Sequence, residues 1–217
     1  MKRRRLFSIP AGKGIPVIAR IPWIRGAVAC VLITGCSLVL TESCAHTRVT
    51  VEGRDRMPQS KAIAQEFSTT LRSELHQAIQ EHGPAGAISI CKGISPRMEQ
   101  RFAAEYPELI RLRRISLKTR NPQTHTPTPE EKQWLLSAQE AMRENKTVDP
   151  GLIVTRGKTT VLFPITINDP VCLLCHGDPQ TMMKEVKTAL RTHYPQDQAT
   201  AYQLGDFRGA LAIEWHN

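Results

Sequence analysis

The stretch GLIVTRGKTTVLFPITI, residues 151–167, decides the fold class of this chain of 217 residues. It holds two runs rich in Val, Ile, Leu and Thr, separated by Arg156-Gly157-Lys158, and this combination is typical of a β-hairpin. LIRLRRISLK (109–118) predicts an earlier strand with its basic residues on the outer face, and DFRGALAIEW (206–215) predicts a closing strand. We therefore expect an antiparallel sheet.

Helices precede and separate these strands. Apolar residues recur every four positions in residues 58–82, which predicts an amphipathic helix of about six turns. Gly83-Pro84 ends this helix and starts a second one, in which Ser95-Pro96 predicts an interruption, either a kink or a restart of the helix. Further helices are expected from Thr128 and near residues 179–193. Helices followed by strands mixed with short helices indicate an α+β fold.

The first 45 residues predict export from the cytoplasm. A segment rich in basic residues, 1–25, precedes an apolar run, 26–40. The small residues of SCA (43–45) are typical of a cleavage site. ITGC, ending at Cys36, resembles a lipid-attachment site, and an uncleaved membrane anchor is a further alternative. We expect residues 1–45 to be a signal peptide or a membrane or lipid anchor, 46–57 a linker, and 58–217 one periplasmic domain, with membrane association through the N-terminal segment as an option.

The charge distribution argues against a nucleic-acid partner. The formal net charge is +9, but residues 1–45 hold seven of the 29 basic residues and only one of the 20 acidic residues. The rest of the chain has no long basic run, which a nucleic-acid surface would require.

The cysteine count points to a bound group. Residues 46–217 contain three cysteines, Cys91, Cys172 and Cys175. An odd number in an oxidising compartment cannot form a simple set of disulfides. At least one thiol must have another role.

CLLCH, residues 172–176, has three interpretations. C-x-x-C-H is the attachment signature of c-type haem, in which two thiols bond the porphyrin edge and the histidine ligates the iron. Zinc would need two further ligands, and no second C-x-x-C is present. A disulfide or redox pair would leave His176 unexplained. We expect one covalently attached haem c, bonded to Cys172 and Cys175 and ligated by His176.

The residue on the other face of the iron is open from the residues alone. Cys91 is the remaining thiol, although a lone buried cysteine is more often a small hydrophobic residue. The candidates by side-chain type are Cys91, Met57, Met98, Met182, Met183, His125, His193 and His216.

Five parts of the chain resemble a known family, the PAS-like c-type haem domain. It occurs alone in bacterial periplasmic proteins and as the sensor part of signalling proteins. The resemblance covers roughly residues 65–215 and rests on the long first helix and on residues 83–96, 113–131, 161–179 and 194–215.

This resemblance implies a PAS-like antiparallel sheet flanked by helices, with a long N-terminal helix. It also implies attachment at Cys172 and Cys175, with His176 and Cys91 as the axial ligands. Lys118, Arg120 and Asn121 are then expected along the haem edge, where cations would offset the propionate charge, although a solvated turn is the simpler interpretation. Arg208 is interpreted as a structural residue of the last strand.

An iron ligated on both faces leaves no place for a substrate, so we expect no enzymatic activity. Two functions remain. One is redox or electron transfer with a redox partner protein. The alternative is a haem-based redox or gas sensor, in which Cys91 is displaced and a signalling partner receives the change. The sequence shows no kinase or cyclase module, which favours the first.

Overall fold

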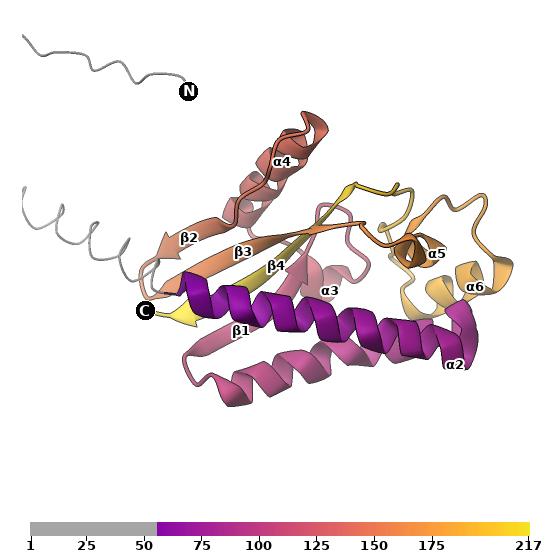
Figure 1. The fold of residues 1–217 in the computed structure, drawn as a ribbon, viewed down its shortest axis with the longest axis horizontal. Helices are drawn as coiled ribbons and strands as arrows, with labels where there is room; N and C mark the ends of the chain where they lie inside the picture. Colours follow the sequence, from indigo (N-terminus) through magenta and orange to yellow (C-terminus); the bar gives the residue numbers. More distant parts are fainter. Residues whose placement is uncertain (1–55) are drawn as a thin grey trace, which may run out of the picture. The chain divides into compact units, whose positions relative to one another are not determined.

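A computed structural model describes residues 56–217. The predicted signal or anchor (1–45), with its lipid-attachment candidate Cys36, and residues 46–55 of the predicted linker lie outside the described residues (Figure 1). Within residues 56–217, no helix combines the length and the apolar character that crossing a membrane requires.

Four antiparallel strands form one sheet in the order β1-β4-β3-β2. Its strands are β1 (Leu109–Ile115), β2 (Gly151–Thr155), β3 (Lys158–Thr166) and β4 (Phe207–His216). β2 and β3 form the predicted hairpin, in which Thr155 pairs with Lys158. The last strand of the chain lies in the sheet interior between β1 and β3. The expected α+β class is confirmed.

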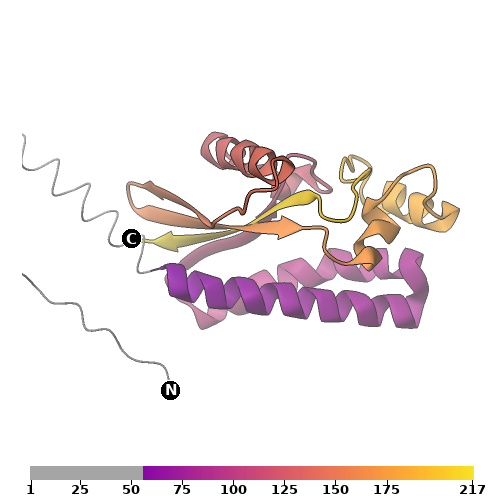
Figure 2. The same cartoon turned by 45° about the horizontal axis from the view of Figure 1, so that its top comes forward.

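The long helix α2 (Met57–Glu105) is a helical hairpin. Gly83 has φ 67° and ψ 171°, so the chain reverses there and the two halves of α2 run side by side (Figure 2). An ion pair of 2.9 Å between Arg97 and Glu74 joins the halves. The helix does not restart at Pro96, because Gly83 is the one residue within α2 that leaves the helical conformation. Pro96 itself is exposed, but Ile94, Ser95 and Met98 close to it are buried, and this burial offsets the hydrogen bond that proline removes.

The sheet lies between α2 on one face and α4 (Pro129–Arg143) on the other (Figure 2). Alternation along β4 serves both layers: Leu211, Ile213 and Trp215 pack in the core with α2, whereas Ala210 and Ala212 pack with α4. α4 begins where the sequence predicts, since Thr128 and Glu131 cap each other's backbone amides.

Two of the three arginines of β1 depart from the prediction that they face outward, whereas Arg111 is exposed as expected. Arg113 is only 5% exposed and pairs with the buried carboxylate of Glu131 at 2.5 Å. Arg114, the next residue, belongs to the opposite face of the strand, the face toward α2. Because helices cover both faces of this sheet, neither arginine lies on a free outer surface.

The remaining short elements are α3 (Pro122–His125), the 3₁₀ helix η1 (Pro170–Cys172), α5 (Leu173–His176) and α6 (Lys184–His193). α5 and α6 lie near the end of the molecule where α2 reverses (Figure 1). The predicted C-x-x-C-H segment therefore sits between this turn of α2 and the end of the sheet.

Candidate functional site

A cavity of about 310 Å³ opens between α2, the ends of β1, β3 and β4, and the segment that contains α5. Cys91 of α2 lines it, and so do Cys172, Cys175 and His176. The fold thus brings the isolated upstream cysteine to the C-x-x-C-H segment. All three cysteines are free thiols.

Local hydrogen bonds hold the segment in place. Asp169 accepts a hydrogen bond from the Val171 amide (2.9 Å) and also contacts His76 of α2 at 3.0 Å. At the other end, Gly177 permits a close turn, because a Cβ atom there would lie 2.5 Å from the Leu173 carbonyl oxygen. The motif is therefore attached to α2 before it and tightly turned after it.

His176 is held in one tautomer. Its Nδ1 atom lies 2.7 Å from the carbonyl oxygen of Ala199, and because a carbonyl only accepts, Nδ1 carries the proton. Burial, together with the charges of Arg120 and Arg208, lowers the pKa of the imidazole well below its usual value. His176 is then neutral with an unprotonated Nε2 atom, the form that ligates metals.

Burial raises the pKa of each of the three thiols. For Cys91 the nearby charges of Arg114 and Arg120 oppose this effect. These thiols are therefore protonated near neutral pH unless a bound group replaces the proton. Bonding to a metal ion would have to displace this proton, because the thiolate is the form of cysteine that ligates metals.

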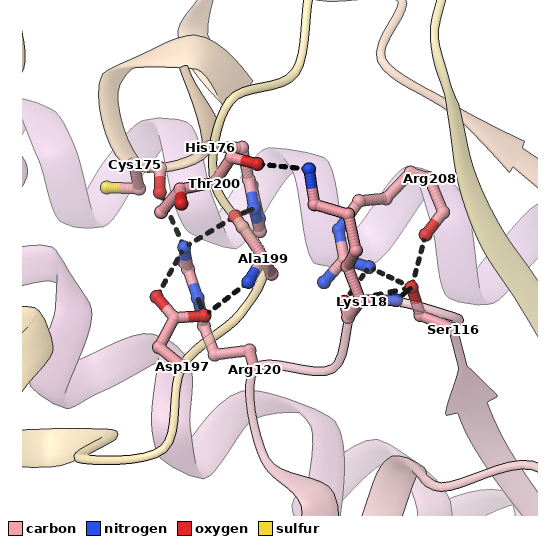
Figure 3. A network of polar contacts seen from close by, with 9 residues as sticks. All are labelled: Ser116, Lys118, Arg120, Cys175, His176, Asp197, Ala199, Thr200 and Arg208. Carbon is pink, nitrogen blue, oxygen red and sulfur yellow. Dashed lines mark hydrogen bonds and ion pairs between the residues drawn. The ribbon is translucent and has the colours of Figure 1, made fainter. Parts of the chain in front are cut away.

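Arg120 lines the cavity, as expected, but its guanidinium is already engaged (Figure 3). It pairs with Asp197 at 3.2 Å and donates to the carbonyl oxygen of Cys175 at 2.5 Å. It also reaches the Ala199 carbonyl at 3.3 Å. Arg120 therefore braces the backbone of the motif and of the loop that contacts His176.

Lys118 and Asn121 do not line this cavity. The Nζ atom of Lys118 donates to the Thr200 carbonyl (Figure 3). It also lies 4.2 Å from the ring centre of Tyr202. Asn121 precedes α3 and lines a second pocket of about 120 Å³. Of the three residues expected along the edge of a bound group, only Arg120 lines the cavity.

Arg208 both stabilises the sheet and lines the cavity. It donates to the Ser116 hydroxyl at 2.7 Å, as expected of a residue that ties β4 to β1, and it also lines the cavity. Arg72 and Arg114 also line the cavity and were not anticipated. No Asp or Glu among residues 56–217 lines it. Arg114 could have been predicted to face the cavity, because strand alternation places it on the same face of β1 as the buried Leu112.

Among the other ligand candidates, His125 lines both pockets. Burial, followed by the charge of Arg114, lowers the pKa of His125 to about 3. The methionines 57, 98, 182 and 183 and the histidines 193 and 216 are not among the lining residues. Within residues 56–217 no three His, Cys, Asp or Glu side chains gather closely enough to hold a metal ion by themselves.

Fold and cavity together define a class of α+β domains in which a helical hairpin and a C-x-x-C-H segment enclose a pocket at one end of an antiparallel sheet. The chain belongs to the Tll0287-like family, whose model matches residues 45–215. It is also similar to a solved structure described as the cyanobacterial heme-protein Tll0287. The identity is 21%, the TM-score is 0.47, and the match covers 67% of this chain and 90% of the other. No curated protein matches the sequence.

Proposed function

We propose that this protein binds one haem c, bonded covalently to Cys172 and Cys175 and ligated by His176 and Cys91, and that it acts in redox or electron transfer rather than as an enzyme. The observation that carries the proposal is the meeting of these four side chains in one cavity. Membership of a family named after a protein described as a heme-protein supports the same cofactor.

The residues of the cavity fit such a group. Apolar side chains from α2, including Leu71, Leu75 and Ile79, offer a surface for a flat macrocycle. The excess of arginine over acidic residues suits a ligand with negatively charged substituents. The two thiols of the motif and His176 match the attachment signature.

A bound haem would supply a one-electron couple, and the chain's own groups would set its behaviour. The hydrogen bond to Ala199 keeps His176 in the tautomer that leaves Nε2 free. Cys91 would give up its thiol proton on ligation, and an anionic thiolate stabilises the oxidised state. Buried apolar neighbours would limit access of water to the iron.

The alternative is a redox or gas sensor that acts through a signalling partner. Cys91 lines both the main cavity and the smaller pocket, so a displaced thiol has space to move into. Reductive titration in the presence and absence of carbon monoxide separates the two functions. A ferrous form that exchanges electrons quickly and binds no carbon monoxide supports electron transfer, and rapid gas binding with loss of thiolate ligation supports the sensor.

The cofactor is tested by expressing the full chain in a host that matures c-type cytochromes. The pyridine complex of the purified protein should have the spectrum of a c-type haem, and acid–acetone should not extract it. Cys172→Ala/Cys175→Ala should abolish covalent attachment, whereas Ser89→Ala, an exposed site on α2, should not. A wild-type protein that contains zinc, a Cys172–Cys175 disulfide or only extractable haem would contradict the proposal.

The proposal also includes a PAS-like domain located in the periplasm, free or anchored through residues 1–45. Cell fractionation of the full chain, compared with a variant that starts at residue 46, tests the location. We expect haem-loaded protein in the periplasmic or membrane fraction only when the N-terminal segment is present. Mass spectrometry of the purified protein distinguishes cleavage after Ala45 from lipid attachment at Cys36 and from an intact anchor.

A further inference from the structure

Arg114 presents an unmatched positive charge to the cavity. It lies on β1, paired with Leu211 of β4, and lines both the main cavity and the smaller pocket. Its guanidinium forms no hydrogen bond or ion pair with any of residues 56–217, and its Nε atom is buried without a partner. Burial lowers the pKa of this arginine, and the nearby Tyr194 and Glu99 oppose this effect only in part.

The other buried arginines near the site have partners. Arg113 pairs with Glu131, Arg120 pairs with Asp197, and Arg208 donates to Ser116 and to the Lys118 carbonyl. Arg72 is exposed to solvent, which compensates its charge. Arg208 also has no carboxylate partner, but its guanidinium is hydrogen-bonded; among these arginines, apart from the exposed Arg72, only Arg114 has neither a hydrogen bond nor an ion pair within residues 56–217. No acidic side chain of the described residues lines the main cavity. Glu99 lines the smaller pocket with Arg114, but its carboxylate is bonded to Ser95 and forms no ion pair with Arg114.

A buried charge without a counterion is costly, so a stable protein supplies a counterion from elsewhere. A carboxylate suits this position, because a guanidinium binds it through two parallel hydrogen bonds. Glu99 attracts Arg114 without forming an ion pair with it, so a molecule in the main cavity is the source that can supply a paired carboxylate.

We propose that Arg114 is the residue that binds a carboxylate of the cavity's ligand. This inference rests on the proposed function, in which the carboxylate is a haem propionate. Arg114 would then orient the group and hold the propionate ionised, and its charge would favour the reduced state. Lys118, Arg120 and Asn121, which the sequence suggested for this position, are engaged elsewhere or lie outside the cavity.

The inference is tested in the haem-loaded full chain with Arg114→Gln. The matched control is Arg111→Gln, which removes the same charge from an exposed position of the same strand. We expect Arg114→Gln to shift the reduction equilibrium about tenfold toward the ferric form, which is about 59 mV for one electron. Between pH 5 and 8 its potential should also become more pH-dependent, because the unpaired propionate takes up a proton more readily. Arg111→Gln should change the equilibrium less than twofold.

Resonance Raman spectroscopy supplies a readout that a structural role would not change. The propionate bending bands should shift in Arg114→Gln and, by a smaller amount, in Arg114→Lys, which keeps the charge but loses the paired geometry. If Arg114→Gln cannot be recovered in folded form, the test uses Arg114→Lys, with Arg111→Lys as its control. The propionate bands should then shift in Arg114→Lys and not in Arg111→Lys.

Equal potentials, pH profiles and Raman bands in the Arg114 and Arg111 variants would overturn the inference. So would loss of thiolate ligation in Arg114→Gln with unchanged propionate bands, because the partner would then be Cys91. A wild-type protein without covalent haem would instead contradict the proposed function, so the two failures are distinguishable.

Discussion

His176 and Ala199 are joined by a hydrogen bond of 2.7 Å from the imidazole Nδ1 atom to the backbone carbonyl oxygen (Figure 3). Asp197 supports this contact, since its Oδ1 atom accepts a hydrogen bond of 2.8 Å from the Ala199 amide and its carboxylate pairs with Arg120. Backbone bonds from Ala201 to Gly177 and from Tyr202 to His176 extend the same connection. The loop after α6 therefore sets the orientation of the motif histidine.

Asp197→Asn should loosen this connection. The side chains of Arg120 and Asp197 are only 14% and 9% exposed, so removing one charge leaves the other poorly compensated. We expect a loss of about 3 kcal/mol in the free energy of unfolding. Chemical denaturation measures it. Glu140→Gln is the control, because its pair with Arg143 is exposed and should contribute less than about 1 kcal/mol. Equal losses in the two variants would show that the Arg120–Asp197 pair is not a buried brace.

Cys91→Ala should change the coordination of the haem without releasing it. Covalent attachment depends on Cys172 and Cys175, whereas Cys91 reaches the cavity from α2. We expect full covalent haem content, a changed ferric absorption spectrum and at least a tenfold shift of the reduction equilibrium toward the ferrous form, because an anionic ligand is lost. Ser89→Ala on the exposed side of the same helix should leave the spectrum unchanged. A wild-type spectrum in Cys91→Ala would make Cys91 a packing residue.

Gly209→Ala should destabilise the entrance of β4 into the sheet. Gly209 has φ 146°, and a Cβ atom there would lie 2.2 Å from the Ile115 carbonyl oxygen. We expect a loss of about 3 kcal/mol or more in the free energy of unfolding, from strain and from disruption of the β1–β4 contact. Gly93→Ala is the matched comparison within α2, where the added methyl group makes an ordinary contact at 3.7 Å. It should stabilise the protein by about 0.5–1 kcal/mol. The same sign for both changes would contradict the close approach at Gly209.

His125 should make stability depend on pH. Its pKa in the folded protein is about 3, below the usual 6.5, so the unfolded chain binds this proton at a higher pH. Stability from this group is complete above about pH 6.5 and falls as the pH drops from there toward 3. Between pH 7 and pH 5 the wild type should lose up to about 2 kcal/mol more than His125→Asn. His82→Asn, at an exposed site, should keep the wild-type slope. Parallel slopes in wild type and His125→Asn would show that His125 is solvated.

Much of this fold is determined locally. The hairpin at residues 151–167, the helix break at Gly83 and the helix start at Thr128 follow from turn chemistry and capping, which act over a few residues. The spacing of Cys172, Cys175 and His176 is likewise a local property that specifies a type of chemistry. These features could be predicted because neighbouring residues alone decide them.

Tertiary structure decided what surrounds the motif. Alternation places Arg113 and Arg114 on opposite faces of β1, but only the packing of α4 and α2 gives one of them a carboxylate and the other a cavity. The helix continues through Pro96 because its neighbours Ile94 and Met98 pack in a core that includes residues of distant strands. Cys91 reaches the C-x-x-C-H segment only because α2 folds back on itself at Gly83. Each of these outcomes depends on contacts between residues far apart in the chain. The free energies of burial and charge pairing in such contacts cannot be predicted from a local sequence pattern.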